Sequence, residues 1–296
     1  MIVMSNGSYG AVPAAVAALL LGGCGGPAGA SDGGTSTVAA FYPLGWVAEQ
    51  VGGERVDVAL LTSPGVEPHD LELTPEQVVQ VADAGVVVTE RGFQPAVDDA
   101  VAQEVDGTVV DAADEVDLVA TAGGETDPHF WHDPVRMAQL ARAVGAAYAD
   151  IDSEGARTYE AATADVVARL RQLDADYRAA LRGCTTTTVV TSHDAFGYLA
   201  ERYGLTVLPI AGLDAGAEPT PEHLAELSDL VRAEGVTTVF TEPLVSPDAG
   251  ETLASEAGLR VDTLDPIEGV TDETADDDYL SLMRANLAAL VEANGC

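Results

Sequence analysis

Short apolar runs and longer amphipathic stretches alternate along most of the chain. Eight runs rich in Val, Thr and other β-forming residues predict strands, and stretches with apolar residues three or four apart predict helices between them. This alternation is typical of parallel sheets covered by helices, so the expected fold class is α/β. The predicted strands cover residues 37–42, 56–61, 85–89, 107–110, 187–192, 205–210, 236–241 and 260–264. The predicted helices include residues 75–83, 134–149, 195–203, 221–234 and 276–293.

The alternation is interrupted once, at residues 153–183, where one long helical pattern contains no strand. A helix of roughly 30 residues is about 45 Å long, which is more than one small lobe needs. We therefore expect an N-terminal α/β lobe over residues 37–152, a connecting helix over 153–183 and a C-terminal α/β lobe over 184–296. The apolar stripe of the long helix comprises Tyr159, Val166, Leu170, Leu173, Tyr177 and Leu181.

The first 36 residues differ in character from the rest. Residues 11–23 form a short apolar run, Cys24 follows directly, and a segment rich in Gly, Ser and Thr comes next. The run has the length of a signal-peptide core and is short for a membrane span. It resembles the lipobox of bacterial lipoproteins, which implies a signal peptide over 1–23, a lipidated Cys24 and a flexible tether over 24–36. The alternative is a cytosolic protein with an Ala-rich N-terminus, because the first ten residues carry no Arg or Lys.

Two further cysteines fit export. Cys184 and Cys296 form an even pair, and such pairs usually bridge outside the cytoplasm. A bond between them would attach the C-terminal helix to the start of the second lobe. Two free thiols are the alternative.

The charge is strongly negative. Asp and Glu number 49 against 13 Arg and no Lys, for a net charge of −36. Such a surface repels phosphate groups and anionic lipid, which disfavours nucleic-acid binding and adsorption to an anionic membrane. An acidic solvated shell is suited to high salt, where screening weakens self-repulsion, so a high-salt habitat is a hypothesis.

Histidines and a carboxylate follow predicted strands. His193 comes directly after one strand, His69 comes after another through a Gly-containing loop, and Asp265 follows the last strand. Ligand sites in parallel α/β sheets gather at the carboxyl ends of the strands. With His129, which lies in a polar segment, these residues predict a four-ligand metal site built from both lobes. A mixed nitrogen and oxygen set suits Zn²⁺ or Mn²⁺ better than Ca²⁺ or Mg²⁺.

Five segments, in order, resemble the motifs of the ZnuA/TroA-type metal receptors. These are the extracytoplasmic solute-binding components of zinc and manganese ABC transporters. The resemblance extends over roughly residues 37–294 and implies two α/β lobes joined by one rigid helix, with the metal in the cleft between the lobes. The segments are GVEPHDLELTP (65–75), DPHFWHDP (127–134), TSHDAFGYLAERYGL (191–205), FTEPLVSPDAGETLASEAG (240–258) and TLDP (263–266).

The resemblance implies the ligands residue by residue. They are His69 in the PHD motif, His129 in DPH, His193 in SHD and Asp265 in LDP. Three imidazoles and one carboxylate favour Zn²⁺, while manganese members often carry Glu at the third place. Mn²⁺ is therefore the alternative cargo.

Two other residues are weaker ligand candidates. His132 lies three residues after His129, and Asp133 and Pro134 behind it are typical of a helix start, so we expect His132 to be packed in the loop. Glu242 follows a predicted strand and could be a hydrogen-bond partner of a ligand or an alternative oxygen ligand.

The function implied is a transport receptor rather than an enzyme. It would capture Zn²⁺ as a transported ligand, without a cofactor, and deliver it to a membrane permease, acting as a monomer at the outer face of the cell membrane. Because histidine ligands must be neutral, we expect affinity to fall at mildly acidic pH. A metallohydrolase is disfavoured, since no HExxH motif or nucleophile elbow occurs. An adhesin or surface protein with a structural metal is the remaining alternative.

Overall fold

The computed structural model describes residues 1–2, 34–103, 105–121 and 124–296. Residues 34–296 form one compact unit. The predicted signal peptide beyond Ile2, the lipidation candidate Cys24 and most of the predicted tether lie outside the described residues. The first strand begins at Thr35, two residues before the predicted start of the N-terminal lobe.

The first half of this unit contains a parallel sheet with the strand order β2-β1-β3-β4. Its central strand β3 is buried on both faces, which explains the uninterrupted run of Val at 86–88. All four strands that the sequence predicts here are confirmed. They are β1 (Thr35–Ala39), β2 (Val56–Leu60), β3 (Val86–Thr89) and β4 (Thr108–Asp111).

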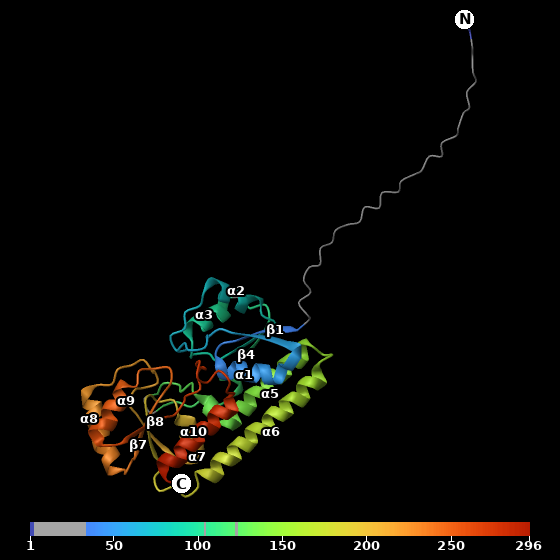
Figure 1. The fold of residues 1–296 in the computed structure, drawn as a ribbon. Helices are drawn as coiled ribbons and strands as arrows, with labels where there is room; N and C mark the ends of the chain where they lie inside the picture. The colour runs from blue at the N-terminus through green and yellow to red at the C-terminus, as the bar shows by residue number, and fades with distance from the viewer. Residues whose placement is uncertain (3–33, 104, 122–123) are drawn as a thin grey trace. The chain divides into compact units, whose positions relative to one another are not determined.

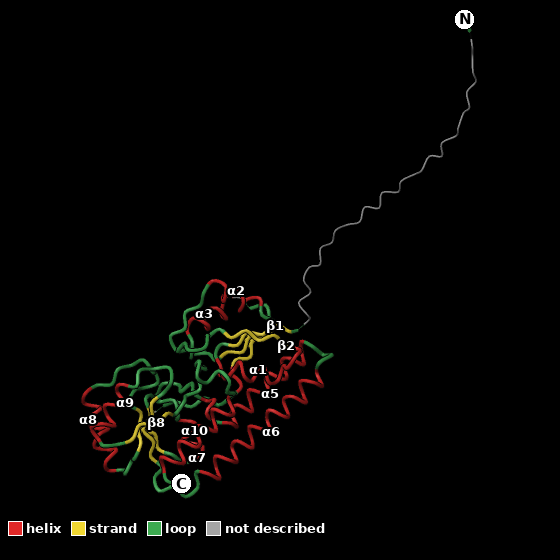
Figure 2. The backbone as a smooth tube through the Cα atoms, viewed as in Figure 1, coloured by secondary structure: helices red, strands yellow, loops and turns green. Residues whose placement is uncertain are grey.

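The second half repeats the architecture, with the strand order β6-β5-β7-β8 and parallel pairing throughout. Strands β5 and β7 are fully buried, while the edge strand β8 is exposed. Figure 2 shows the strands as two separate groups, each flanked by helices. The strands are β5 (Thr188–Thr191), β6 (Thr206–Pro209), β7 (Thr238–Thr241) and β8 (Arg260–Thr263).

Helix ends follow the local sequence signals. Thr74 and Gln77 form a capping box at the start of α2, and Asp133 accepts a hydrogen bond from the Val135 amide at the start of α5. Gly295 ends α10 in the left-handed region, at φ +65°. The α-helices are α1 (Tyr42–Gly52), α2 (Pro75–Asp83), α3 (Pro95–Gln103), α4 (Ala112–Glu115), α5 (Pro134–Ile151), α6 (Ala156–Ala180), α7 (Gly197–Tyr203), α8 (Pro221–Ala233), α9 (Asp248–Ala257) and α10 (Tyr279–Asn294), with short 3₁₀ turns at Gly53–Arg55 and Phe130–His132.

The long helix predicted over 153–183 is α6, which is 25 residues long. It lies along α5 and also packs on α1 and α10 (Figure 1). Its apolar stripe is buried as predicted, and Tyr177 donates a hydrogen bond of 2.6 Å to the Met283 carbonyl of α10. The helix is therefore part of the packed core as well as a connection.

The main hydrophobic core joins the two halves. It contains Phe41 near the first sheet, Leu173 of α6, and Leu264 and Tyr279 from the C-terminal half. A smaller cluster, which includes Val190 and other residues of the C-terminal half, lies apart from it. Residues of both halves therefore pack into one core, which holds the two sheets together.

Cys184 and Cys296 are joined by a disulfide, and the amides of Thr185 and Thr186 donate to the Asn294 carbonyl beside it.

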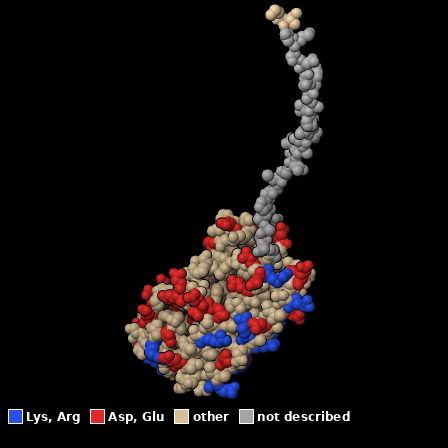
Figure 3. Space-filling view, turned by 45° about the vertical axis from the view of Figure 1, so that its right-hand side comes forward, with Lys and Arg blue, Asp and Glu red and all other residues tan. Residues whose placement is uncertain are grey.

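Acidic side chains are spread over the visible face of the molecule, with fewer Arg side chains between them (Figure 3). Among the helices described, none has both the length and the apolar character that a membrane span requires.

Candidate metal centre

Three histidines and one glutamate converge at the carboxyl ends of strands from both sheets. His69 follows β2, His193 follows β5 and Glu268 follows β8. His129 immediately precedes the 3₁₀ turn that leads into α5. One ligand atom from each of the four residues lies within 4.8 Å of the others.

Four of the six spacings among these atoms match a tetrahedral zinc site, and the remaining two, from His69 Nε2 to the other imidazole nitrogens, are within 4.8 Å. The Glu268 Oε1 atom lies 3.5 Å from His69 Nε2, 3.3 Å from His129 Nε2 and 3.2 Å from His193 Nε2. The two nitrogens His129 Nε2 and His193 Nε2 are 3.3 Å apart. Zinc bonds of about 2.0–2.1 Å at tetrahedral angles place ligand atoms about 3.3–3.4 Å apart. These edges are therefore the size that Zn²⁺ requires.

Carboxylates hold two of the rings from behind. Asp127 Oδ1 lies 2.8 Å from His129 Nδ1 and also accepts the His129 amide at 2.9 Å. Glu242 Oε1 lies 2.7 Å from His193 Nδ1 and accepts the His193 amide at 3.0 Å. With Nδ1 engaged in this way, Nε2 is the nitrogen left for a metal. Glu242 thus acts as the hydrogen-bond partner that was one of the two roles predicted for it, and it is not one of the four converging residues.

The electrostatics of the site favour protonated imidazoles beside ionised carboxylates when no metal is bound. Burial lowers the pKa of His193, but its contacts with Glu242 and Glu268 outweigh burial and raise that pKa to about 10. For His129, burial is likewise outweighed by Asp127 and Glu268, and the pKa is raised. Burial raises the pKa of Glu268, but its close contacts with the three histidines hold that pKa well below its usual value. A metal ion must therefore displace protons to bind.

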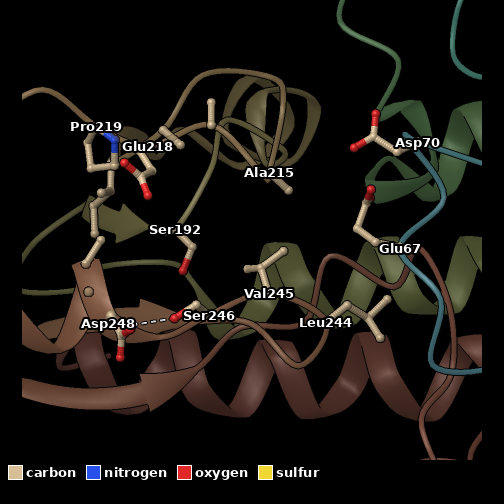
Figure 4. Close-up of a pocket in the computed structure, with 16 residues that line it drawn as sticks. Glu67, Asp70, Ser192, Ala215, Glu218, Pro219, Leu244, Val245, Ser246 and Asp248 are labelled. Atoms are coloured by element: carbon tan, nitrogen blue, oxygen red, sulfur yellow. Dashed lines mark hydrogen bonds between the residues drawn. The ribbon is translucent and has the colours of Figure 1, made fainter.

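The site opens on the His69 side. The His69 side chain is 14% exposed, whereas the other three ligand candidates are almost completely buried. A cavity of about 650 Å³ has Glu67 and Asp70, the neighbours of His69, in its wall (Figure 4). None of the four converging residues lines this cavity, but carboxylates in its wall attract cations to the neighbourhood of His69. The polar lining residues are Glu67, Asp70, Ser192, Glu218, Ser246 and Asp248.

The structure differs from the sequence prediction at the fourth ligand position. Asp265 is not among the converging residues, and its Oδ1 atom accepts the Ile267 amide at 2.7 Å. Glu268, three residues later in the same loop, takes that place. The motif TLDP ends at Pro266 and therefore does not include Glu268. A second acidic residue three positions after Asp265 was nevertheless visible in the sequence.

His132 is packed away from the four residues. It is fully buried and packs against Phe196, with ring centroids 4.6 Å apart and the ring planes tilted by 37°. Neither ring nitrogen has a hydrogen-bond partner within the described part of the chain, and burial lowers the His132 pKa to about 3. This agrees with the expectation that His132 is packed in the loop.

Comparison with known proteins decides the family. A family model described as ZnuA, "Zinc-uptake complex component A periplasmic", matches residues 37–293. The chain belongs to the ZnuA family. As a member, it is a substrate-binding component of a metal-uptake system and not an enzyme, and it works outside the cytoplasm.

Individual relatives point the same way. The chain is 30% identical over 276 residues to the high-affinity zinc uptake system protein ZnuA of Bacillus subtilis, covering 86% of each chain. It is 31% identical over 282 residues to the zinc-binding lipoprotein AdcA of Streptococcus pneumoniae, covering 88% of this chain but only 56% of AdcA. The chain thus spans little more than half of AdcA.

Solved structures share the two-sheet fold. The Zn(II)-bound ZnuA-like domain of Streptococcus pneumoniae AdcA aligns with a TM-score of 0.78 at 32% identity, covering 89% of this chain and 100% of that domain. The laminin-binding protein Lmb of Streptococcus agalactiae, described as bifunctional with adhesin and metal-transporting activity, aligns with a TM-score of 0.81 at 30% identity, covering 88% of this chain and 99% of that one. The α/β fold with two parallel sheets predicted from the sequence is confirmed.

Proposed function

We propose that this ZnuA-family protein captures Zn²⁺ outside the cytoplasm and delivers it to the membrane permease of an ABC transporter. The observation that carries the proposal is the convergence of three imidazole Nε2 atoms on the Glu268 carboxylate, at 3.2–3.5 Å. We assign the ligand set as His69, His129, His193 and Glu268, with Glu268 in the place first predicted for Asp265. Four protein ligands close the coordination shell, so no metal-bound water remains for hydrolysis.

Zinc is the favoured cargo because of the donor atoms. Imidazole nitrogen binds Zn²⁺ more tightly than Mn²⁺, and the short edges between the donor atoms suit four-coordination. Mn²⁺, which prefers more oxygen ligands, is the alternative. The proposal also includes a monomer that is attached to the membrane through a lipid on Cys24.

A competition experiment tests the cargo and the site together. The purified protein is stripped with a chelator, offered equal Zn²⁺ and Mn²⁺, and analysed for bound metal. We expect one Zn²⁺ per chain. The His193→Ala variant should bind zinc more weakly by orders of magnitude, whereas His223→Ala should match the parent because His223 lies in α8, outside the four converging residues. Bound Mn²⁺ that survives the competition would contradict the zinc assignment.

Adhesion is a second candidate function. The observation in its favour is the similarity to structures named as laminin-binding proteins, at 28% and 30% identity. Binding of the zinc-loaded protein to immobilised laminin would support this function, and binding equal to that on an albumin surface would remove it.

A further inference from the structure

The loop that delivers Glu268 to the site contains an unusual backbone conformation. Ile267 has φ +56°, and within the described residues it is the one non-glycine residue with a positive φ. This region is disfavoured for L-residues, and a β-branched residue there is a genuine outlier. Such conformations persist only where the surroundings enforce them, and they concentrate at functional sites. Ile267 immediately precedes Glu268, so its backbone sets the direction of the ligand carboxylate.

Asn286 of α10 fastens the start of this loop at two points. The Asp265 amide donates to Asn286 Oδ1 at 2.9 Å, and Asn286 Nδ2 donates to the Asp265 carbonyl at 2.6 Å. Asn286 is only 2% exposed, so these two bonds satisfy an amide group that would be costly to bury alone. One side chain thus fixes both backbone polar groups of a single loop residue.

Two further contacts fix the residues between Asp265 and Glu268. The Asp265 side chain accepts the Ile267 amide at 2.7 Å, and Trp131 Nε1 donates to the Pro266 carbonyl at 2.7 Å. The loop is therefore held at each of the three residues before Glu268. Among these contacts, the pair made by Asn286 is the one that ties the loop to α10.

We propose that Asn286 is a positioning residue for metal binding. By holding the Asp265 backbone, it keeps Ile267 in the left-handed region and aims the Glu268 carboxylate at the three imidazoles. The inference rests on the proposed function, because it takes Glu268 as a zinc ligand. The proposal also gives Asp265 a role. Its carboxylate, which the sequence suggested as a ligand, accepts the Ile267 amide and so closes the turn that presents Glu268.

A double-mutant cycle tests this inference. Zinc dissociation constants are measured by competition with a chromophoric chelator for the parent, Asn286→Leu, Glu268→Gln and the double variant. We expect Asn286→Leu to weaken zinc binding about 10- to 100-fold, the range typical of residues that orient a ligand. With Glu268→Gln already present, the same change should alter the dissociation constant by less than about twofold, because its target is gone.

The possible results distinguish a wrong role for Asn286 from a wrong assignment of zinc binding. An equal loss of affinity on adding Asn286→Leu to either background would show a general structural role and overturn the proposal. An unchanged affinity in Asn286→Leu, or in Glu268→Gln, would overturn it as well. A parent protein that binds no zinc would contradict the proposed function itself.

A matched control is available on the same helix. Asn294 is also 2% exposed in α10, and its Nδ2 atom has no hydrogen-bond partner within the described residues. Asn294→Leu should leave zinc affinity unchanged. Thermal unfolding of each metal-free variant shows whether it is folded. If Asn286→Leu does not fold, the smaller change Asn286→Ser enters the same cycle and is judged by the same two comparisons.

Discussion

Zinc binding should release a proton from His193, and Glu242 should control that release. The His193 pKa is raised to about 10, with its hydrogen bond to Glu242 as the largest cause that raises it. His193 is therefore protonated at neutral pH when no metal is bound. Since zinc binds the neutral ring, the proton must leave as the metal enters.

The size of the effect follows from this pKa. Below about pH 10, each decrease of one pH unit lowers the apparent zinc affinity about tenfold, because the neutral form of His193 becomes about ten times rarer. Between pH 7 and pH 9, this single proton should thus raise the affinity about 100-fold. His129, whose pKa is also raised, adds to the slope where it is protonated.

Calorimetry measures the released protons directly. Zinc is titrated into the metal-free protein at pH 8 in buffers of different ionisation enthalpy, and the dependence of the observed heat on that enthalpy gives the number of protons. We expect at least about one proton for the parent. Glu242→Gln removes the carboxylate charge and should lower the number, while Glu226→Gln, on the exposed face of α8, should not.

A parent protein that releases no proton at pH 8 would contradict the raised His193 pKa. If Glu242→Gln releases as many protons as the parent, Glu242 does not control the His193 pKa and the prediction is wrong.

Other predictions follow from packing and linkage. His132→Ala should lower the free energy of unfolding by about 2–5 kcal/mol, as for other large buried side chains, yet keep one zinc per chain, and a loss of zinc would place His132 in the site. Reduction of Cys184–Cys296 should lower the unfolding temperature, because closing a loop of sequence separation 112 contributes about 4–5 kcal/mol in the chain-entropy model, and an identical melt in reductant would contradict this. In the metal-free protein, the stability that the raised His193 pKa contributes is fully present below about pH 6.5 and should be lost as pH rises through about 10, so a denaturant midpoint that rises over this range would contradict the assignment. Chelation of the metal should leave far-UV circular dichroism unchanged, since an extensive apolar core drawn from both halves holds the fold together, and unfolding would indicate a structural metal.

Much of the fold was predictable because its signals are local. The eight strands are short Val- and Thr-rich runs, and α2 lies where its Thr74 cap and Pro75 predict it, over residues 75–83. The long helix is shorter than its pattern at both ends, since α6 spans Ala156–Ala180. At its start, Asp152 accepts the Gly155 amide in a turn that precedes the helix. That turn depends on a contact outside the helix, since Arg55 pairs with the same Asp152 carboxylate.

Local sequence patterns were enough to locate the strand ends and to place His193 two residues behind β5, while His69 was placed by its motif in the longer loop after β2. Which carboxylate lies beside these histidines depends on the folded chain. Asp265 and Glu268 share one loop, and a local pattern treats both as residues behind a strand. The turn contains Ile267 in the left-handed region. Asn286 contacts it through Asp265, 21 residues away in the sequence, and Trp131 contacts it through Pro266, 135 residues away. Contacts of that range form only when the chain has folded, so the fourth ligand could not be predicted from the motif alone.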